Sequence, residues 1–360
     1  MAARTRVLIV DDSAVVRKLI ADRLRREPDI EVVGGAADPF VARDLILQHK
    51  PDVVTLDIEM PRMDGLTFLK KLMAHYPLPV IIVSSATQSG SAASIEALRS
   101  GAIDVIAKPG GPQSVGQVTD RIAATIRGIS ASAAVRFRPA PSPAASRVAA
   151  AVGAKRYNGL ILIGASTGGT QAIEAILTRL PADTPPIVIV QHMPAYFTRA
   201  FADRLDQICG VHVVEATADM LLERGTAYIA PGDYHMTLVR VGLQLRTALN
   251  QDAPVHHQRP AVDVLFESAA QIRGVPMVAM LLTGMGADGA DGMVALRKAG
   301  AETIAEDEQS CVVFGMPKEA IARGGAAHVA PLLKMPTLVI ECLERVATRR
   351  VAQEGRASPG

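Results

Sequence analysis

The stretch LILIGASTGG, residues 160–169, decides the fold of the larger part of the chain. Residues 160–163 are consecutively apolar, which is typical of a parallel strand covered on both faces. The small residues on either side of Ser166 permit a tight turn, and a helix is expected to start after it. A buried strand that turns directly into a helix predicts an α/β domain.

The same kind of pattern continues on the carboxyl side of this stretch. Further strands are expected at residues 187–190, 211–214, 227–230, 243–249 and 276–282. Further helices are expected near Thr198, Pro260 and Asp288 and at residues 337–349. We therefore predict an α/β domain with a doubly wound parallel sheet over residues 158–348, followed by a flexible tail at residues 349–360.

The amino-terminal residues 1–127 form a second region of the same type. Strands are expected at residues 7–10, 30–33, 53–56, 80–83 and 103–107, most of them apolar on consecutive positions. Ser13 and Asp38 are expected to cap the helices that follow them, and Pro39 suits a first helical position. Five strand–helix units predict a doubly wound parallel sheet. Residues 128–157 include RFRPAPSPAASR, whose prolines and serines predict a linker between the two domains.

The composition narrows the classes of function. The chain of 360 residues has 38 Lys and Arg against 36 Asp and Glu, and only 3% of its residues are aromatic. Balanced charge and few aromatic residues disfavour binding to nucleic acids. Three widely spaced cysteines match a reducing compartment, and neither a signal peptide nor a membrane-spanning run of apolar residues is apparent. We expect a cytoplasmic protein that does not insert into a membrane.

Three polar residues are expected at one edge of the second sheet. Ser166 lies in a Gly-x-Ser-x-Gly pattern, as in the nucleophile elbow of serine hydrolases. His192 follows the next expected strand, and Asp288 follows the strand at 276–282. The carboxyl ends of parallel strands meet at one edge of a sheet. A hydroxyl nucleophile, an imidazole base and an orienting carboxylate are what acyl transfer requires.

Other interpretations of this edge stay open. A glycine-rich turn between a strand and a helix also binds phosphates, so a nucleotide site is an alternative. Ser166 alone would suit an ordinary helix cap. Rival residues for the base are His235, His256 and His257, and Asp291 is a rival for the acid.

A cluster of charged residues is expected at the matching edge of the first sheet. Asp11 and Asp12 end its first strand, Asp57 its third, Ser84 its fourth and Lys108 its fifth. Crowded carboxylates favour a hard cation, and Mg²⁺ suits oxygen ligands. Beside such a cation, Asp57 is placed to accept a phosphoryl group as a nucleophile. Lys108 would neutralise part of the added charge.

Residues 6–127, with the motifs VDDS, DIEMPRMDG, VSS and KP, resemble the receiver domain of two-component response regulators. The resemblance implies a flavodoxin-like fold and phosphorylation by a histidine kinase. It also implies functions for individual residues: phosphorylation at Asp57, a Mg²⁺ site of Asp11, Asp12, Asp57 and the carbonyl of Glu59, and switching by Ser84 and Lys108. Receivers often carry an aromatic switch residue three positions before the lysine, where this chain has Val105.

Residues 158–348, with GASTGG, QHMP, APGDYHM, QRPAVDVLF and LLTGMGADGADGM, resemble the catalytic domain of chemotaxis protein-glutamate methylesterases, the CheB family. The resemblance implies hydrolysis of γ-glutamyl methyl esters on chemoreceptors, deamidation of glutamines, and no cofactor for the ester chemistry. It implies site residues as well: the triad Ser166, His192 and Asp288, an oxyanion hole at the backbone of Thr167 and Met285, and a substrate groove near His235 and Arg259. The family usually has Ser where this chain has Ala261.

Control by the first domain is a further hypothesis. We expect the unphosphorylated receiver to obstruct the Ser166 edge and phosphorylation at Asp57 to favour an open arrangement. Two other outputs remain as alternatives: a second domain that binds a nucleotide or a partner without catalysis, and a DNA-binding domain. The latter is disfavoured because no helix-turn-helix pattern is apparent and the charge is balanced.

Overall fold

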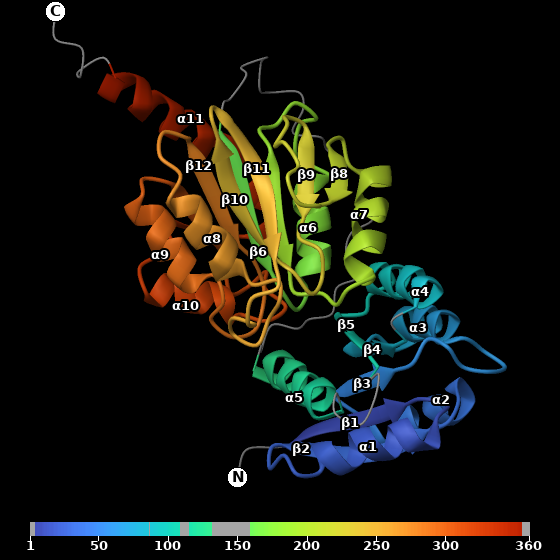
Figure 1. The fold of residues 1–360 in the computed structure, drawn as a ribbon. Helices are drawn as coiled ribbons and strands as arrows, with labels where there is room; N and C mark the ends of the chain where they lie inside the picture. Colours follow the sequence, from blue (N-terminus) through green and yellow to red (C-terminus); the bar gives the residue numbers. More distant parts are fainter. Residues whose placement is uncertain (1–3, 86, 109–114, 132–158, 355–360) are drawn as a thin grey trace, which may run out of the picture. The chain divides into compact units, whose positions relative to one another are not determined.

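The computed structural model describes residues 4–85, 87–108, 115–131 and 159–354 (Figure 1). The chain divides into two compact units, Met1–Ser142 and Pro143–Gly360. Most of the predicted linker, residues 132–157, lies outside the described residues, but residues 128–131 are the end of a helix. Residues 349–354 of the predicted tail are likewise helical, and residues 355–360 are not described.

The first unit is a five-stranded parallel sheet in the order β2-β1-β3-β4-β5. Its strands are β1 Thr5–Val10, β2 Ile30–Ala36, β3 Val53–Leu56, β4 Val80–Ser84 and β5 Asp104–Ala107. Its helices are α1 Ala14–Leu24, α2 Pro39–His49, α3 Gly65–His75, α4 Gln88–Arg99 and α5 Val115–Ala131. This order is that of flavodoxin-like folds and confirms the predicted doubly wound sheet.

Local signals fixed two helix starts in this unit. The hydroxyl of Ser13 accepts a hydrogen bond from Val16 N at the start of α1. The carboxylate of Asp38 accepts from the first-turn N–H groups of α2, with Pro39 at the first helical position. Both caps were predicted from the sequence and are confirmed.

The second unit is built on a seven-stranded parallel sheet in the order β14-β13-β12-β6-β7-β9-β8. Its strands are β6 Leu160–Ala165, β7 Ile187–Gln191, β8 His212–Glu215, β9 Thr226–Ile229, β12 Met277–Leu281, β13 Glu302–Glu306 and β14 His328–Ala330. Its helices are α6 Gly169–Leu177, α7 Phe197–Ile208, α8 Val262–Ala270, α9 Ala290–Lys298, α10 Met316–Ala322 and α11 Met335–Glu354, with the 3₁₀ turn η2 Leu332–Lys334.

Parts of this unit were missed in the sequence. The strand expected at residues 243–249 is one arm of an antiparallel hairpin, β10 His235–Val241 with β11 Gln244–Asn250, and the hairpin forms a sheet of its own. β13 escaped prediction because its sequence, ETIAE, begins and ends with glutamates, although both are buried. β14 has only three residues, too few for a periodic pattern.

The topology brings β12, β6 and β7 together as neighbours. Leu281 pairs with Gly164, and Ala165 pairs with Gln191, so all three strands end at the same level of the sheet. Ser166 and His192 each follow the last paired residue of their strand, and the loop after β12 carries Asp288. The predicted triad residues are therefore delivered to one edge.

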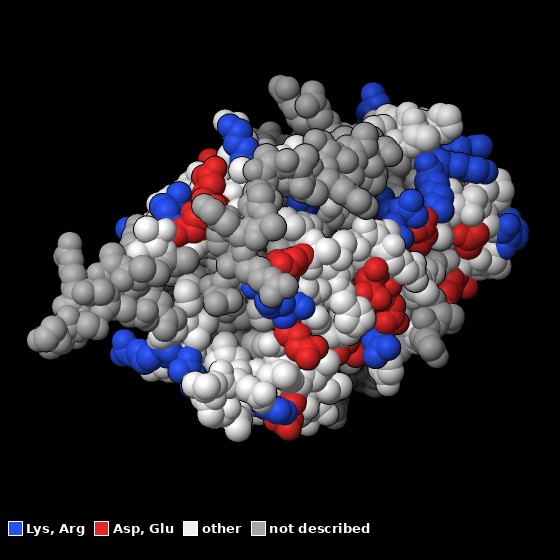
Figure 2. All heavy atoms as spheres, turned by 90° about the horizontal axis from the view of Figure 1, so that it is seen from above, with Lys and Arg blue, Asp and Glu red and all other residues white. Residues whose placement is uncertain are grey.

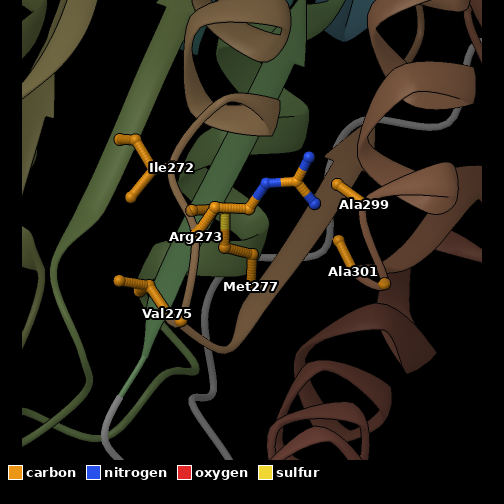
Figure 3. A pocket seen from close by; sticks show the side chains of 8 residues that line it. Ile272, Arg273, Val275, Met277, Ala299 and Ala301 are labelled. Atoms are coloured by element: carbon orange, nitrogen blue, oxygen red, sulfur yellow. The ribbon is translucent and has the colours of Figure 1, made fainter.

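A small pocket lies at the other end of the sheet from Ser166, near the amino ends of β12 and β13 (Figure 3). Its lining includes Arg273, Val275, Met277, Ala299 and Ala301. Because it lies at the amino ends of these strands, it is remote from the loop that carries Ser166. It brings no cluster of catalytic side chains together.

On the face drawn in Figure 2, Lys and Arg are interspersed with Asp and Glu where the residues are described. The two kinds of charge are also nearly equal in number over the whole sequence. Among the described residues, no helix is long and apolar enough to cross a lipid bilayer.

Candidate functional site

Ser166 lies in the turn from β6 into α6. Its N–H donates to the carbonyl of Thr283 (3.0 Å), and its carbonyl accepts from Gly169 N (2.7 Å) and from Gln191 Nε2 (2.9 Å). The helix α6 begins only at Gly169, with Gly168 at the capping position and no side-chain cap. The interpretation of Ser166 as a helix cap is therefore wrong, and its partly exposed side chain is available for another task.

Two glycines make room for this turn. Gly168 has φ +77°, a left-handed conformation that favours glycine, and a Cβ there would lie 2.6 Å from Val312. A Cβ on Gly284 would lie 2.8 Å from Cβ of Ser166 and 2.3 Å from the sulfur of Met316. The loop after β12 can therefore approach the serine only because residue 284 has no side chain.

His192 occupies the matching position on β7. Its N–H donates to the carbonyl of Ala165 (3.1 Å), and neighbouring strands lie about 4.8 Å apart, so its backbone runs beside that of Ser166. Its Nε2 donates to Oδ2 of Asp288 (2.7 Å), and both side chains are only 2% exposed. The carboxylate fixes the ring with Nε2 protonated, which makes Nδ1 the basic nitrogen.

Asp288 is held by more than the histidine. Its Oδ2 also accepts from Val262 N (2.7 Å), and its Oδ1 accepts from Asp263 N (2.9 Å). Burial alone would raise its pKa, but the hydrogen bond and charge of His192 and the two N–H groups hold the pKa of Asp288 below its usual value. The carboxylate is therefore ionised at neutral pH.

The rival residues have other partners. The rival acid, Asp291, is exposed and pairs with Arg323 (2.8 Å). His235 is buried at the start of β10, where Nδ1 accepts from Ala261 N and Nε2 lies 3.2 Å from a backbone carbonyl. His256 donates to Asp263 (3.0 Å) rather than to Asp288. His257, the neighbour of His256, is exposed and has a positive φ.

The remaining predicted residues of this site lie around the same edge. Met285 is 38% exposed in the loop that contacts Ser166, and the carbonyl of Thr167 accepts from the hydroxyl of Thr283 (2.9 Å). Arg259 donates to Asp233 and to two backbone carbonyls of the segment after β11, so its guanidinium joins two loops.

One buried acid near this edge was not predicted. Glu306, at the end of β13, accepts from Thr283 N (2.8 Å), and the carbonyl of Thr283 in turn accepts from Ser166 N. Burial raises the pKa of Glu306 to about 7. Glu306 is the last residue of β13, a strand that was not predicted, so its position at the carboxyl end of a strand could not be inferred from the sequence.

The first unit gathers its predicted cluster as well. Lys108 Nζ lies 2.7 Å from Oδ2 of Asp57 and 2.9 Å from Oδ2 of Asp11. Asp57 is fully buried, and its Oδ1 accepts from Glu59 N (3.2 Å). Burial raises the pKa of Asp57 to about 6, although the hydrogen bond and charge of Lys108 act to lower it.

This cluster has the chemistry of a cation and phosphoryl site. Carboxylate oxygens of Asp11, Asp12 and Asp57 lie within 4.8 Å of one another, which fits the oxygen ligands of Mg²⁺. The buried hydroxyl of Ser84, at the end of the next strand, has no hydrogen-bond partner among the described residues. An unpaired buried hydroxyl is costly, so it suits an acceptor that arrives from outside, such as a phosphoryl oxygen.

A second group of side chains that could bind a metal lies beside the positive charge of an arginine. The ligand atoms of Glu302, His328 and Cys342 lie within 4.8 Å of one another. The guanidinium of Arg345 lies 2.8 Å from the sulfur of Cys342 and 3.3 Å from Nε2 of His328. An arginine therefore already supplies the positive charge that a metal ion would bring.

Comparison with known proteins gives two family matches. Residues 161–339 match the CheB methylesterase family, and residues 7–120 match the response regulator receiver domain.

Related proteins match over nearly the whole chain. The chain is 52% identical to protein-glutamate methylesterase/protein-glutamine glutaminase 2 of Syntrophus aciditrophicus, over 92% of this chain and 96% of the relative. It is 49% identical to the protein of the same name from Cupriavidus pinatubonensis, over 97% and 98%. Among solved structures, the Thermotoga maritima CheB methylesterase catalytic domain is 41% identical, with a TM-score of 0.50, over 51% of this chain and 98% of that domain.

Proposed function

Because the chain belongs to the CheB family of protein-glutamate methylesterases/protein-glutamine glutaminases, we propose that Ser166, His192 and Asp288 carry its ester hydrolysis. The enzyme removes methyl groups from γ-glutamyl methyl esters of chemoreceptors, and its receiver domain makes it subject to control by phosphorylation. The observation that carries the triad assignment is the 2.7 Å bond between His192 and Asp288, beside the strand that Ser166 directly follows.

In the proposed acylation, Ser166 Oγ attacks the ester carbonyl while Nδ1 of His192 accepts its proton. Asp288 stabilises the imidazolium that forms, through its bond to Nε2. Backbone N–H groups at Thr167 and Met285 are the proposed donors to the oxyanion. The intermediate then expels methoxide, which takes the proton from His192 and leaves as methanol.

Deacylation repeats these steps with water. His192 removes a proton from water, which attacks the acyl-serine carbonyl, and Ser166 leaves with that proton as free glutamate forms. The same residues can deamidate a glutamine, with ammonia as the leaving group. An amine leaves less readily than an alkoxide, so we expect deamidation to be the slower reaction.

For control, we assign phosphorylation to Asp57, with a histidine kinase as the proposed phosphodonor. Asp11, Asp12, Asp57 and the carbonyl of Glu59 would hold Mg²⁺, which when bound neutralises charge on the phosphoryl group. Lys108 contacts two of these carboxylates and Ser84 offers its unpaired hydroxyl, so both are placed to respond to the new group. We propose that phosphorylation relieves obstruction of the Ser166 edge by the receiver.

We assign residues 1–127 to the receiver and residues 158–348 to the catalytic domain. The substrate and the phosphodonor both belong to a chemotaxis pathway, so we place the reaction in the cytoplasm.

The test is methanol release from methylated chemoreceptor. We expect Ser166→Ala and His192→Ala to lose nearly all activity, and we expect beryllofluoride to raise the rate of wild type but not of Asp57→Ala. Full activity of Ser166→Ala would exclude the catalytic assignment. Equal wild-type rates with and without beryllofluoride would exclude the obstruction by the receiver. Binding of a nucleotide without methanol release would favour the non-catalytic alternative.

A further inference from the structure

The helices α8 and α9 begin next to each other, and neither has a capping side chain of its own. The residue at the start of α8 is Ala261, and the residue at the start of α9 is Gly289. A helix start leaves N–H groups that need acceptors, and both starts are buried here. The acceptors must therefore come from elsewhere in the chain.

Each helix receives its cap from an acid of the other. Asp288, just before α9, accepts from the first two N–H groups of α8, those of Val262 (2.7 Å) and Asp263 (2.9 Å). Asp263, in the first turn of α8, accepts at Oδ1 from Gly292 N in the first turn of α9 (2.7 Å). The two carboxylates thus tie the helix starts together reciprocally.

The other oxygen of Asp263 is also engaged. Its Oδ2 accepts from Nε2 of His256 (3.0 Å), whose side chain is 39% exposed. His256 and Asp263 therefore form a second histidine–aspartate pair, next to the pair of His192 and Asp288. Asp263 itself is 3% exposed, and burial raises its pKa, with a further contribution from the charge of Asp288.

We propose that Asp263 is a positioning residue for the triad, because its cap on α9 fixes the backbone that carries Asp288 and its charge supports the imidazolium of His192. The orientation in which Asp288 bonds to His192 is kept only if α8 and α9 hold their positions relative to each other. The inference rests on the proposed catalytic role of Asp288.

Among the described residues, two titratable groups face Asp263. Asp288 reaches it from the loop before α9, and His256 reaches it from the segment before α8. Asp291, also in the first turn of α9, is paired with Arg323 of the segment after α10. Removal of the negative charge of Asp263 is therefore expected to make protonation of His192 less favourable.

Two substitutions separate the cap from the charge. Asp263→Ala removes both, whereas Asp263→Asn keeps an oxygen that can accept from Gly292 N and removes only the charge. The control is Asp291→Ala, which removes an acid in the first turn of α9 that pairs with Arg323 and lies outside the network. Methanol release from methylated receptor is measured on full-length protein with beryllofluoride, together with Asp288→Ala and Ser166→Ala.

We expect Asp263→Ala to lower kcat at least tenfold with KM within twofold of wild type. We expect Asp263→Asn to recover kcat to within about threefold and to move the acid limb of kcat/KM to lower pH. Asp291→Ala is expected to stay within twofold of wild type.

Three results would overturn the inference: wild-type kcat in Asp263→Ala, a loss confined to KM, or an unmoved acid limb in Asp263→Asn. If the alanine variant does not fold, the acid limb of the asparagine variant decides. If Asp288→Ala and Ser166→Ala also remain active, the catalytic assignment itself fails; if they are inactive, only the role of Asp263 is lost.

Discussion

Each unit has a buried aspartate beyond the carboxyl end of a strand in its parallel sheet. The pKa values of these two aspartates are shifted in opposite directions. Asp57 follows β3 and Asp288 follows β12, each at the carboxyl end of a parallel sheet. Burial raises the pKa of Asp57 to about 6 in spite of Lys108, whereas His192 and two N–H groups hold the pKa of Asp288 below its usual value in spite of burial.

The difference follows from the number and kind of hydrogen-bond donors around each carboxylate. Asp288 accepts from two backbone N–H groups in addition to a histidine, and this suits a permanent anion that orients a base. Asp57 accepts from one backbone N–H group and from Lys108. Its charge is less fully stabilised, and we propose that a cation and a phosphoryl group complete that site.

The largest expected effect tests the Asp57 side of the comparison. Asp57→Asn removes the nucleophilic oxygen, so no phosphoryl group should be incorporated from acetyl phosphate, and methanol release should no longer respond to the phosphodonor. Phosphoprotein formation and turnover are measured on the same samples. Chelation of Mg²⁺ should also prevent phosphorylation of wild type but leave ester hydrolysis by unphosphorylated protein intact. Phosphorylation that persists in Asp57→Asn would show that another residue is the acceptor.

The next effect tests the Asp288 side. Asp288→Asn keeps the shape of the side chain but no longer stabilises the His192 imidazolium with a charge, so kcat should fall by about 10³-fold or more. Steady-state methanol release measures the loss. A fall of less than tenfold would mean that the low pKa of Asp288 reflects helix capping alone.

A third buried carboxylate extends the comparison, because Glu306 accepts from Thr283 N and has no salt-bridge partner among the described residues. Its pKa is raised from 4.5 to about 7, so the folded protein keeps this proton after the unfolded chain has lost it. The unfolding free energy should therefore decline between pH 4.5 and pH 7, by roughly 3 kcal/mol at most from this group.

Glu306→Gln cannot ionise but can still accept from Thr283 N. The variant should gain stability relative to wild type as the pH rises from 5 to 7, and the difference should then level off. Denaturant unfolding of both proteins at several pH values, followed by a probe in the second unit, measures it. Parallel pH dependence of the two proteins would contradict the raised pKa.

The smallest expected effect concerns the start of α1. This helix is capped by the residue just before it, whereas α8 and α9 are capped by residues far away in the sequence. Ser13→Ala removes the single side-chain bond at the start of α1, which is long at 3.4 Å, so the expected cost is about 1 kcal/mol or less. Hydrogen exchange of the α1 amides measures this local loss. A loss well above 1 kcal/mol in these amides would contradict the small contribution assigned to the Ser13 cap.

The sequence was sufficient where a local pattern or the general geometry of parallel sheets determines where a residue lies. The apolar runs located β1, β3, β6 and β7, and the convergence of polar residues at the carboxyl ends of parallel strands placed Ser166, His192 and Asp288 along one edge. The caps at Ser13 and Asp38 are local as well.

The sequence was insufficient where a residue is satisfied by a distant segment. Asp288 caps α8 rather than the helix it precedes, and the N-cap residue of α8, Ala261, gives no sign of a cap. Asp263 appears as an ordinary acid in a first helical turn, yet its partner Gly292 lies 29 residues away. The strand that ends at Glu306 has glutamates at both ends, and only the folded sheet shows that they are buried.

The most direct test of the central claim is whether Ser166 and His192 act as one unit. Single-turnover methanol release is measured for Ser166→Ala, His192→Ala and the variant that carries both substitutions. Residues that act in the same step lose their contribution together, so we expect the double variant to be no slower than the slower single variant. A double variant whose loss equals the product of the two single losses would contradict it.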